Sequence, residues 1–101
     1  MKYKLLITKD AHNDIEEIVN YISNVLHNPV AAGKLLMEIE EVYKILSDNP
    51  ESFEYCRDKR LRDGGYRKIP VKNYIIFYKI EQDVVYIMRV IYGRRNYTNI
   101  I

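Results

Sequence analysis

Apolar residues recur every three or four positions through the first half of the chain. One stripe runs through residues 11–26 and a second through residues 32–46, and this period predicts two helices of about five turns each. Thr8 can cap the first helix, and Pro29 suits the first turn of the second. The short link predicts an antiparallel helical hairpin, with Asp14 off the stripe and facing water. The stripes consist of Ala11, Ile15, Ile18, Val19, Ile22, Val25 and Leu26, and of Ala32, Leu35, Leu36, Ile39, Val42, Tyr43 and Leu46.

Shorter runs of apolar and aromatic residues predict strands elsewhere in the chain. A first strand is expected at Tyr3–Ile7. Residues 66–71 predict another, which Pro70 restricts to the edge of a sheet, an end or a bulge because proline has no amide hydrogen. Residues 73–80 and 84–91 are rich in β-branched and aromatic side chains, and they predict a β-hairpin.

The length of the hairpin loop determines which side chains share a face of the sheet. If Glu81–Asp83 form a three-residue loop, Ile80 lies opposite Val84. Both faces are then largely apolar, so we expect both to be covered, one by the helical hairpin. Something other than the helical hairpin would cover the face with Lys79 and Arg89. The first face would hold Tyr74, Ile76, Tyr78, Tyr86, Met88 and Val90, and the second Ile75, Phe77, Lys79, Val85, Ile87, Arg89 and Ile91.

The size and composition of the chain indicate one soluble globular domain, residues 1–101, with 48% hydrophobic and 30% charged residues. The apolar runs are too short for a membrane span or a secretory signal, and the lone Cys56 cannot form an internal disulfide. A cytoplasmic location is therefore expected. His12 and His27 lie at opposite ends of the first helix, so we expect neither a metal nor a cofactor.

The charge is unevenly distributed along the chain. Residues 1–56 contain five Lys/Arg against ten Asp/Glu, whereas residues 57–101 contain eleven against four. A basic half suggests a surface that meets phosphates or an acidic partner, since arginine binds phosphate oxygens and tyrosine can stack on bases. The alternative is an ordinary solvated surface. The candidate residues for binding a target or nucleic acid are Lys59, Arg60, Arg62, Arg67, Lys72, Arg94 and Arg95.

These features resemble the RelE/ParE superfamily of bacterial toxins over nearly the whole chain. The resemblance lies in the first strand, in two helices separated at Asn28-Pro29, and in the segments GYRKIPVKNYIIFYKI and RVIYGRR. It implies an α+β fold with a helical hairpin packed on an antiparallel sheet. It also implies the toxin half of a type II toxin–antitoxin (plasmid-stabilisation) module, which inhibits growth and is neutralised by a cognate antitoxin protein.

The resemblance leaves two activities open. RelE-like members are metal-free endonucleases that cleave mRNA in the ribosome, and here such chemistry would use Arg67, Arg89, Arg94 or Arg95, and Tyr97. ParE-like members are not enzymes and inhibit DNA gyrase. The long helices favour the ParE-like branch, as does Ile75, which stands where RelE-like members commonly have arginine. A toxin-like domain without toxicity is a third alternative.

The antitoxin is expected to cover the sheet face with Ile75, Phe77 and Arg89, and its acidic residues would meet the basic half of the chain.

Overall fold

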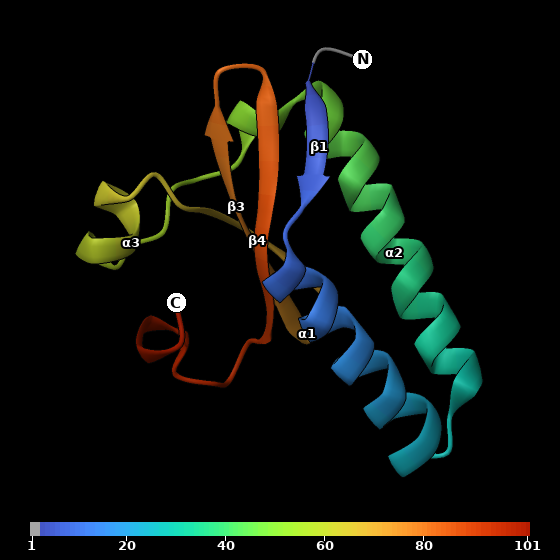
Figure 1. Ribbon diagram of the computed structural model, residues 1–101. Coiled ribbons are helices and arrows are strands. Elements are labelled where there is room, and N and C mark those ends of the chain that lie inside the picture. Colours follow the sequence, from blue (N-terminus) through green and yellow to red (C-terminus); the bar gives the residue numbers. More distant parts are fainter. Residues whose placement is uncertain (1–2) are drawn as a thin grey trace.

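A four-stranded sheet forms the centre of the computed structural model, which describes residues 3–101. Figure 1 shows a pair of helices against one side of this sheet, with the short helix α3 (Lys59–Asp63) and the C-terminal segment, residues 93–101, on the other. The expected α+β class is confirmed. The elements are β1 (Lys4–Ile7), α1 (Lys9–Asn20), the π-helix η1 (Tyr21–Val25), α2 (Pro29–Asp48), the 3₁₀-helix η2 (Pro50–Ser52), α3 (Lys59–Asp63), β2 (Arg67–Val71), β3 (Tyr74–Glu81), β4 (Val84–Tyr92) and the 3₁₀-helix η3 (Tyr97–Asn99).

The strands lie in the order β1-β4-β3-β2. The pairs β2–β3 and β3–β4 are antiparallel, as expected, but β1 runs parallel to β4, so the sheet is mixed rather than wholly antiparallel. The strand with Pro70 lies at the sheet edge, where its missing amide hydrogen breaks no ladder.

The helical hairpin is capped at both of its N-termini. The Thr8 hydroxyl accepts a hydrogen bond from the Ala11 amide at 3.2 Å, and the Asn28 side chain accepts one from the Ala31 amide at 3.1 Å. Between these caps α1 widens into the π-helix η1, and the chain then turns at His27, whose φ is 53°. Within residues 3–101 the helices include none that is both long and apolar enough to cross a membrane.

The β3–β4 register differs from the predicted one. The turn contains two residues rather than three, because Gln82 adopts a φ of 56° and Ile80 pairs with Val85. Met88 then forms an extra residue in β4, and beyond it Phe77 pairs with Arg89. Because of this bulge, the residues of β4 from Arg89 onward lie on the faces that were predicted for them. Near the turn the prediction was wrong, since Val85 lies on the helix-covered face.

Each face of the sheet carries its own apolar cluster. The larger cluster joins the helical hairpin to one face and includes Ala11, Leu35, Ile39, Leu46, Ile69, Val71, Ile76, Tyr78, Val85, Ile87 and Val90. The smaller cluster, on the opposite face, consists of Cys56, Leu61, Phe77 and Ile91, with Tyr66, Ile75, Tyr97, Ile100 and Ile101 packed against it. The face expected to need a further cover is thus covered by α3 and the C-terminal segment of the same chain (Figure 1).

Two buried tyrosine hydroxyls provide a matched test of this packing. Burial raises the pKa of both Tyr43 and Tyr78 to about 12. The Tyr78 hydroxyl donates to the Pro50 carbonyl at 2.6 Å, whereas the Tyr43 hydroxyl has no partner among residues 3–101. We expect Tyr78→Phe to lower the free energy of unfolding by about 1 kcal/mol, and Tyr43→Phe to leave it unchanged or raise it slightly. Urea denaturation measures both, and equal losses would contradict the assignment.

Candidate interaction surface

Arg67 is a structural residue of the β2 edge. Its Nη1 donates to the Phe53 carbonyl at 2.6 Å and to the Glu51 carbonyl at 3.3 Å. Its guanidinium carbon also lies 3.9 Å from the centre of the Tyr55 ring, a cation–π contact. Arg67 therefore fastens the segment that follows α2 to the sheet.

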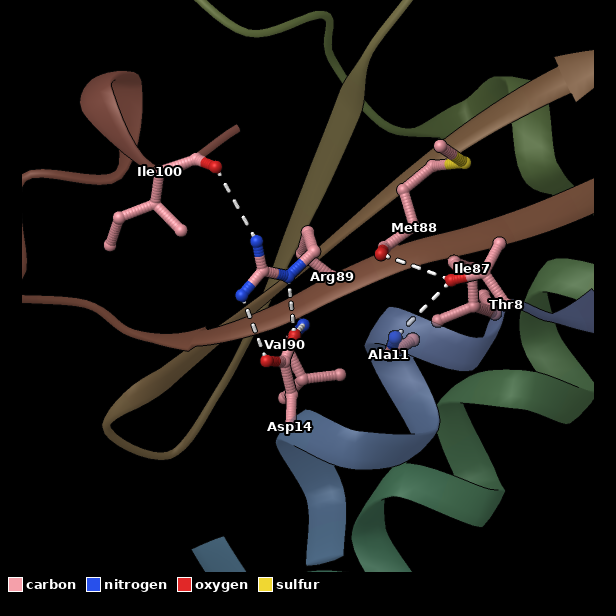
Figure 2. A network of polar contacts seen from close by, with 8 residues as sticks. All are labelled: Thr8, Ala11, Asp14, Ile87, Met88, Arg89, Val90 and Ile100. Atoms are coloured by element: carbon pink, nitrogen blue, oxygen red, sulfur yellow. Dashed lines mark hydrogen bonds and ion pairs between the residues drawn. The ribbon is translucent and has the colours of Figure 1, made fainter. Parts of the chain in front are cut away.

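Arg89 forms an internal ion pair with Asp14 of α1 (Figure 2). Its Nε and Nη2 donate to the two carboxylate oxygens at 2.7 and 2.9 Å, and the side chains are only 21% and 12% exposed. The hydrogen bond to Asp14 raises the pKa of Arg89. The expectation that Asp14 faces water was wrong.

Asp14 also completes the edge of the sheet. β1 pairs with β4 only as far as Ile7, opposite Ile87, so the β4 edge beyond that point lacks a strand partner. There the Asp14 carboxylate accepts a hydrogen bond from the Val90 amide at 2.9 Å. One carboxylate thus holds the β4 backbone and Arg89 together, and α1 continues where β1 ends (Figure 2).

Two of the arginines considered for RNA cleavage, Arg67 and Arg89, lie on opposite faces of the sheet. Arg67 pairs with Tyr78, and Arg89 pairs with Phe77. Because neighbouring residues of a strand point to opposite sides, the two guanidinium groups are separated by the sheet. Tyr97 lies on the Arg89 side, with its ring centre 4.9 Å from that of Phe77.

Arg60 of α3 holds the C-terminal segment, whereas its neighbours Lys59 and Arg62 make local contacts. Arg60 donates to the carbonyl oxygens of Thr98 and, at 2.9 Å, of Ile101. Lys59 forms an ion pair with Asp63 at 2.6 Å, and Arg62 donates to the Arg57 carbonyl at 3.3 Å. Together with α3, the C-terminal segment covers the face on which an antitoxin was expected.

A different group of residues surrounds an open groove between the tip of the helical hairpin and the far ends of β3 and β4. We call it the tyrosine groove and define it by its lining residues, which are Glu17, Ile18, Tyr21, Leu26, Asn73, Tyr74, Tyr92 and Arg95. Its volume is about 700 Å³. The rings of Tyr74 and Tyr92 meet edge to face, with centres 5.7 Å apart. Leu26, Asn73 and Tyr74 also line an adjoining pocket that contains Lys34 and Lys72.

Comparison with known proteins identifies the family. The sequence matches the family model described as the ParE toxin of the type II toxin–antitoxin system parDE, over residues 5–97. The chain belongs to the ParE toxin family. The resemblance to RelE/ParE toxins is thereby confirmed.

Solved structures share the fold of this ParE-family toxin. One, from the chromosomal ParDE toxin–antitoxin system of P. aeruginosa, has a TM-score of 0.73 and 20% sequence identity, and the match covers 90% of this chain and 96% of that one. Another, from the toxin–antitoxin complex RelBE2 of Mycobacterium tuberculosis, has a TM-score of 0.63 and 19% identity, and the match covers 91% and 99%. No curated protein shows significant sequence similarity.

In this ParE-family toxin the predicted cations thus separate into three groups. Arg67 and Arg89 make internal contacts, and the α3 cations lie beside the C-terminal segment. Arg95 lines the tyrosine groove and Lys72 the adjoining pocket, and Arg94 is exposed next to Arg95. Residues 3–101 contain no cluster of His, Cys, Asp and Glu side chains that could hold a metal ion.

The tyrosine groove was not predicted from the sequence. Its three tyrosines come from α1's extension, β3 and β4, and only the fold brings them together. The signal available in the sequence was a large aromatic residue, Tyr21, that lies off the first apolar stripe. In the structure its side chain is 51% exposed.

Proposed function

We propose that this toxin inhibits growth by binding an essential protein target, DNA gyrase, and that it does not cleave RNA. The observation that carries the proposal is the engagement of Arg67 and Arg89 in internal contacts on opposite faces of the sheet. A metal-free ribonuclease needs cations that converge on one phosphate and stabilise its developing charge. The aliphatic Ile75, packed against the smaller apolar cluster, supports the same interpretation.

We further propose that a cognate antitoxin neutralises the toxin in the cytoplasm. The two solved structures come from a ParDE system and from a RelBE2 toxin–antitoxin complex, which supports a partner of this kind. The face with Ile75, Phe77 and Arg89 remains the proposed antitoxin site. Since Phe77 is fully buried beneath Tyr97, an antitoxin that contacts Phe77 must first displace the C-terminal segment.

Two assays on the purified toxin separate the proposed activities. We expect inhibition of gyrase supercoiling at micromolar toxin, and no new 5′ ends in primer extension on mRNA that is being translated. As a control, added antitoxin should abolish the inhibition. Cleavage of mRNA in the ribosomal A site, without gyrase inhibition, would replace the proposal with the endonuclease alternative. In that case Arg94, Arg95 and Tyr97 would be the first residues to substitute.

A further inference from the structure

The tyrosine groove exposes large apolar side chains that a soluble protein ordinarily covers. Tyr21 is 51% exposed and Leu26 is 53% exposed, and both border the same hollow as Tyr74 and Tyr92. Single exposed apolar residues are common, but several around one concave site indicate a place for a ligand. The groove is therefore a better candidate for binding than the scattered exposed residues elsewhere on the helices.

The backbone at the hairpin tip is built in an unusual way beside this groove. η1 is a π-helix, a conformation that is rare and often occurs at functional sites. The Leu26 amide donates to the Tyr21 carbonyl at 3.0 Å, which ties the two groove residues to one turn. His27 follows with a φ of 53°, uncommon for a residue with a side chain. The tip thus holds Tyr21 and Leu26 in fixed positions over the ends of β3 and β4.

Polar groups at the groove are available for a partner. The hydroxyls of Tyr21, Tyr74 and Tyr92 make no hydrogen bond to any side chain or backbone group within residues 3–101. The three hydroxyls lie close together. The pKa of Tyr74 is raised mainly by burial and also by the nearby Tyr92 and Tyr21. Burying such hydroxyls without partners would cost free energy, so a ligand must supply polar groups as well as apolar ones.

The charges around the groove select the kind of ligand. Arg95 lies at the groove, and Lys34 and Lys72 line the adjoining pocket. Lys72 is within 3.4 Å of Glu38, but both side chains are about half exposed, so this pair is weakly held. One carboxylate, that of Glu17, lies among the groove residues. Over the groove and the adjoining pocket, three cations thus face two carboxylates, Glu17 and the Glu38 beside Lys72, and this small positive excess favours an acidic ligand.

The ring geometry favours a protein segment over a nucleic acid. Tyr74 and Tyr92 are inclined at 64° to one another, so they do not offer parallel faces to successive bases. Two aliphatic residues, Ile18 and Leu26, also line the groove. An apolar side chain flanked by carboxylates fits this lining better than a stacked base.

We propose that the tyrosine groove binds an acidic segment of the toxin's protein target. An apolar side chain of that segment would lie among Tyr21, Leu26 and Tyr92, and its carboxylates would pair with Arg95 and Lys72. The proposal rests on the function proposed above. We assign the groove to the target rather than the antitoxin because it is open in the free toxin, which must meet its target with the surface it already exposes. The sheet face proposed for the antitoxin is instead covered.

The test compares target inhibition with antitoxin affinity in two groove variants. For Tyr21→Ser/Tyr92→Ser we expect at least about a tenfold higher toxin concentration for half-inhibition of gyrase, with antitoxin Kd changed less than about threefold. Arg95→Glu should act in the same direction and removes no ring, so it retains the test if the double variant folds poorly. The matched controls are Met37→Ser, at an exposed apolar position on α2, and Lys44→Glu, at an exposed cation on α2.

Each other outcome overturns the proposal. Folded groove variants that inhibit as strongly as the controls would show that the groove is not used. If the groove variants lose affinity for the antitoxin but still inhibit gyrase, the groove belongs to the antitoxin. Binding of a 12-nucleotide single-stranded RNA that the variants lose would assign it to nucleic acid. If the unsubstituted toxin does not inhibit gyrase, the proposed function fails separately; growth arrest on expression then tests the groove, and variants that still arrest growth would refute it.

Discussion

Replacing Asp14 with alanine is expected to lower the free energy of unfolding by about 3 kcal/mol. The substitution removes the two carboxylate acceptors of Arg89 and leaves that guanidinium, only 21% exposed, with the Ile100 carbonyl at 3.5 Å as its remaining acceptor. It also deprives the Val90 amide of its acceptor at a point where β1 no longer pairs with β4. Urea denaturation followed by circular dichroism measures the loss, and the slope with denaturant should stay unchanged.

The neighbouring Glu16 provides the control. Its side chain is 60% exposed, and within residues 3–101 its one polar side-chain contact is with the exposed His12, so Glu16→Ala should change stability by less than about 0.5 kcal/mol. In an Arg89→Met background, Asp14→Ala should cost less by about 1–3 kcal/mol, because the two residues act as a unit. Additive losses would show that the ion pair contributes nothing beyond its separate members.

Replacing Phe77 with alanine is expected to cost about 3–5 kcal/mol, a large part of the stability of a domain this size. Phe77 is fully buried between the sheet and the C-terminal segment, in contact with the ring of Tyr97. The cavity would remove the apolar support of that segment as well as the transfer free energy of the ring. Urea denaturation measures the stability, and limited proteolysis should show earlier cleavage after residue 95.

Phe77→Leu separates the size of the side chain from its burial. Leucine keeps most of the apolar contact and should cost about 1–1.5 kcal/mol. Met37→Ala, at a position that is 68% exposed, serves as the surface control. If Phe77→Ala were as stable as Met37→Ala, the C-terminal segment would not be packed on the sheet, and the face would be free for a partner without any displacement.

The helices were predictable because their signal is local. The stripe that ends at Leu46 and the caps at Thr8 and Asn28 lie within a few residues of the turns they specify. The register of the β3–β4 hairpin was not predictable, since it depends on the positive φ of Gln82 and on a bulge at Met88. Neither residue belongs to the glycine and asparagine types that ordinarily mark such turns.

The candidate site was predictable only as a set of residue types. The basic second half indicated binding, but the sequence did not show which cations are already engaged. Arg89 meets Asp14 from 75 residues away, and Arg67 meets the Phe53 carbonyl from 14 residues away. These contacts depend on how α1 and the segment after α2 pack on the sheet. They engage Arg67 and Arg89, two of the residues considered for catalysis, in contacts within the toxin.

The parallel pairing of β1 with β4 has a consequence for synthesis of the toxin. Lys4 pairs with Val84, so β1 leaves the ribosome long before its partner strand has been made. Until then β1 has no strand beside it, and such distant pairings form late. A partly synthesised chain therefore does not contain the complete sheet. Translation of an interrupted message likewise yields a fragment without it. The four-stranded sheet can be completed only when translation has passed β4.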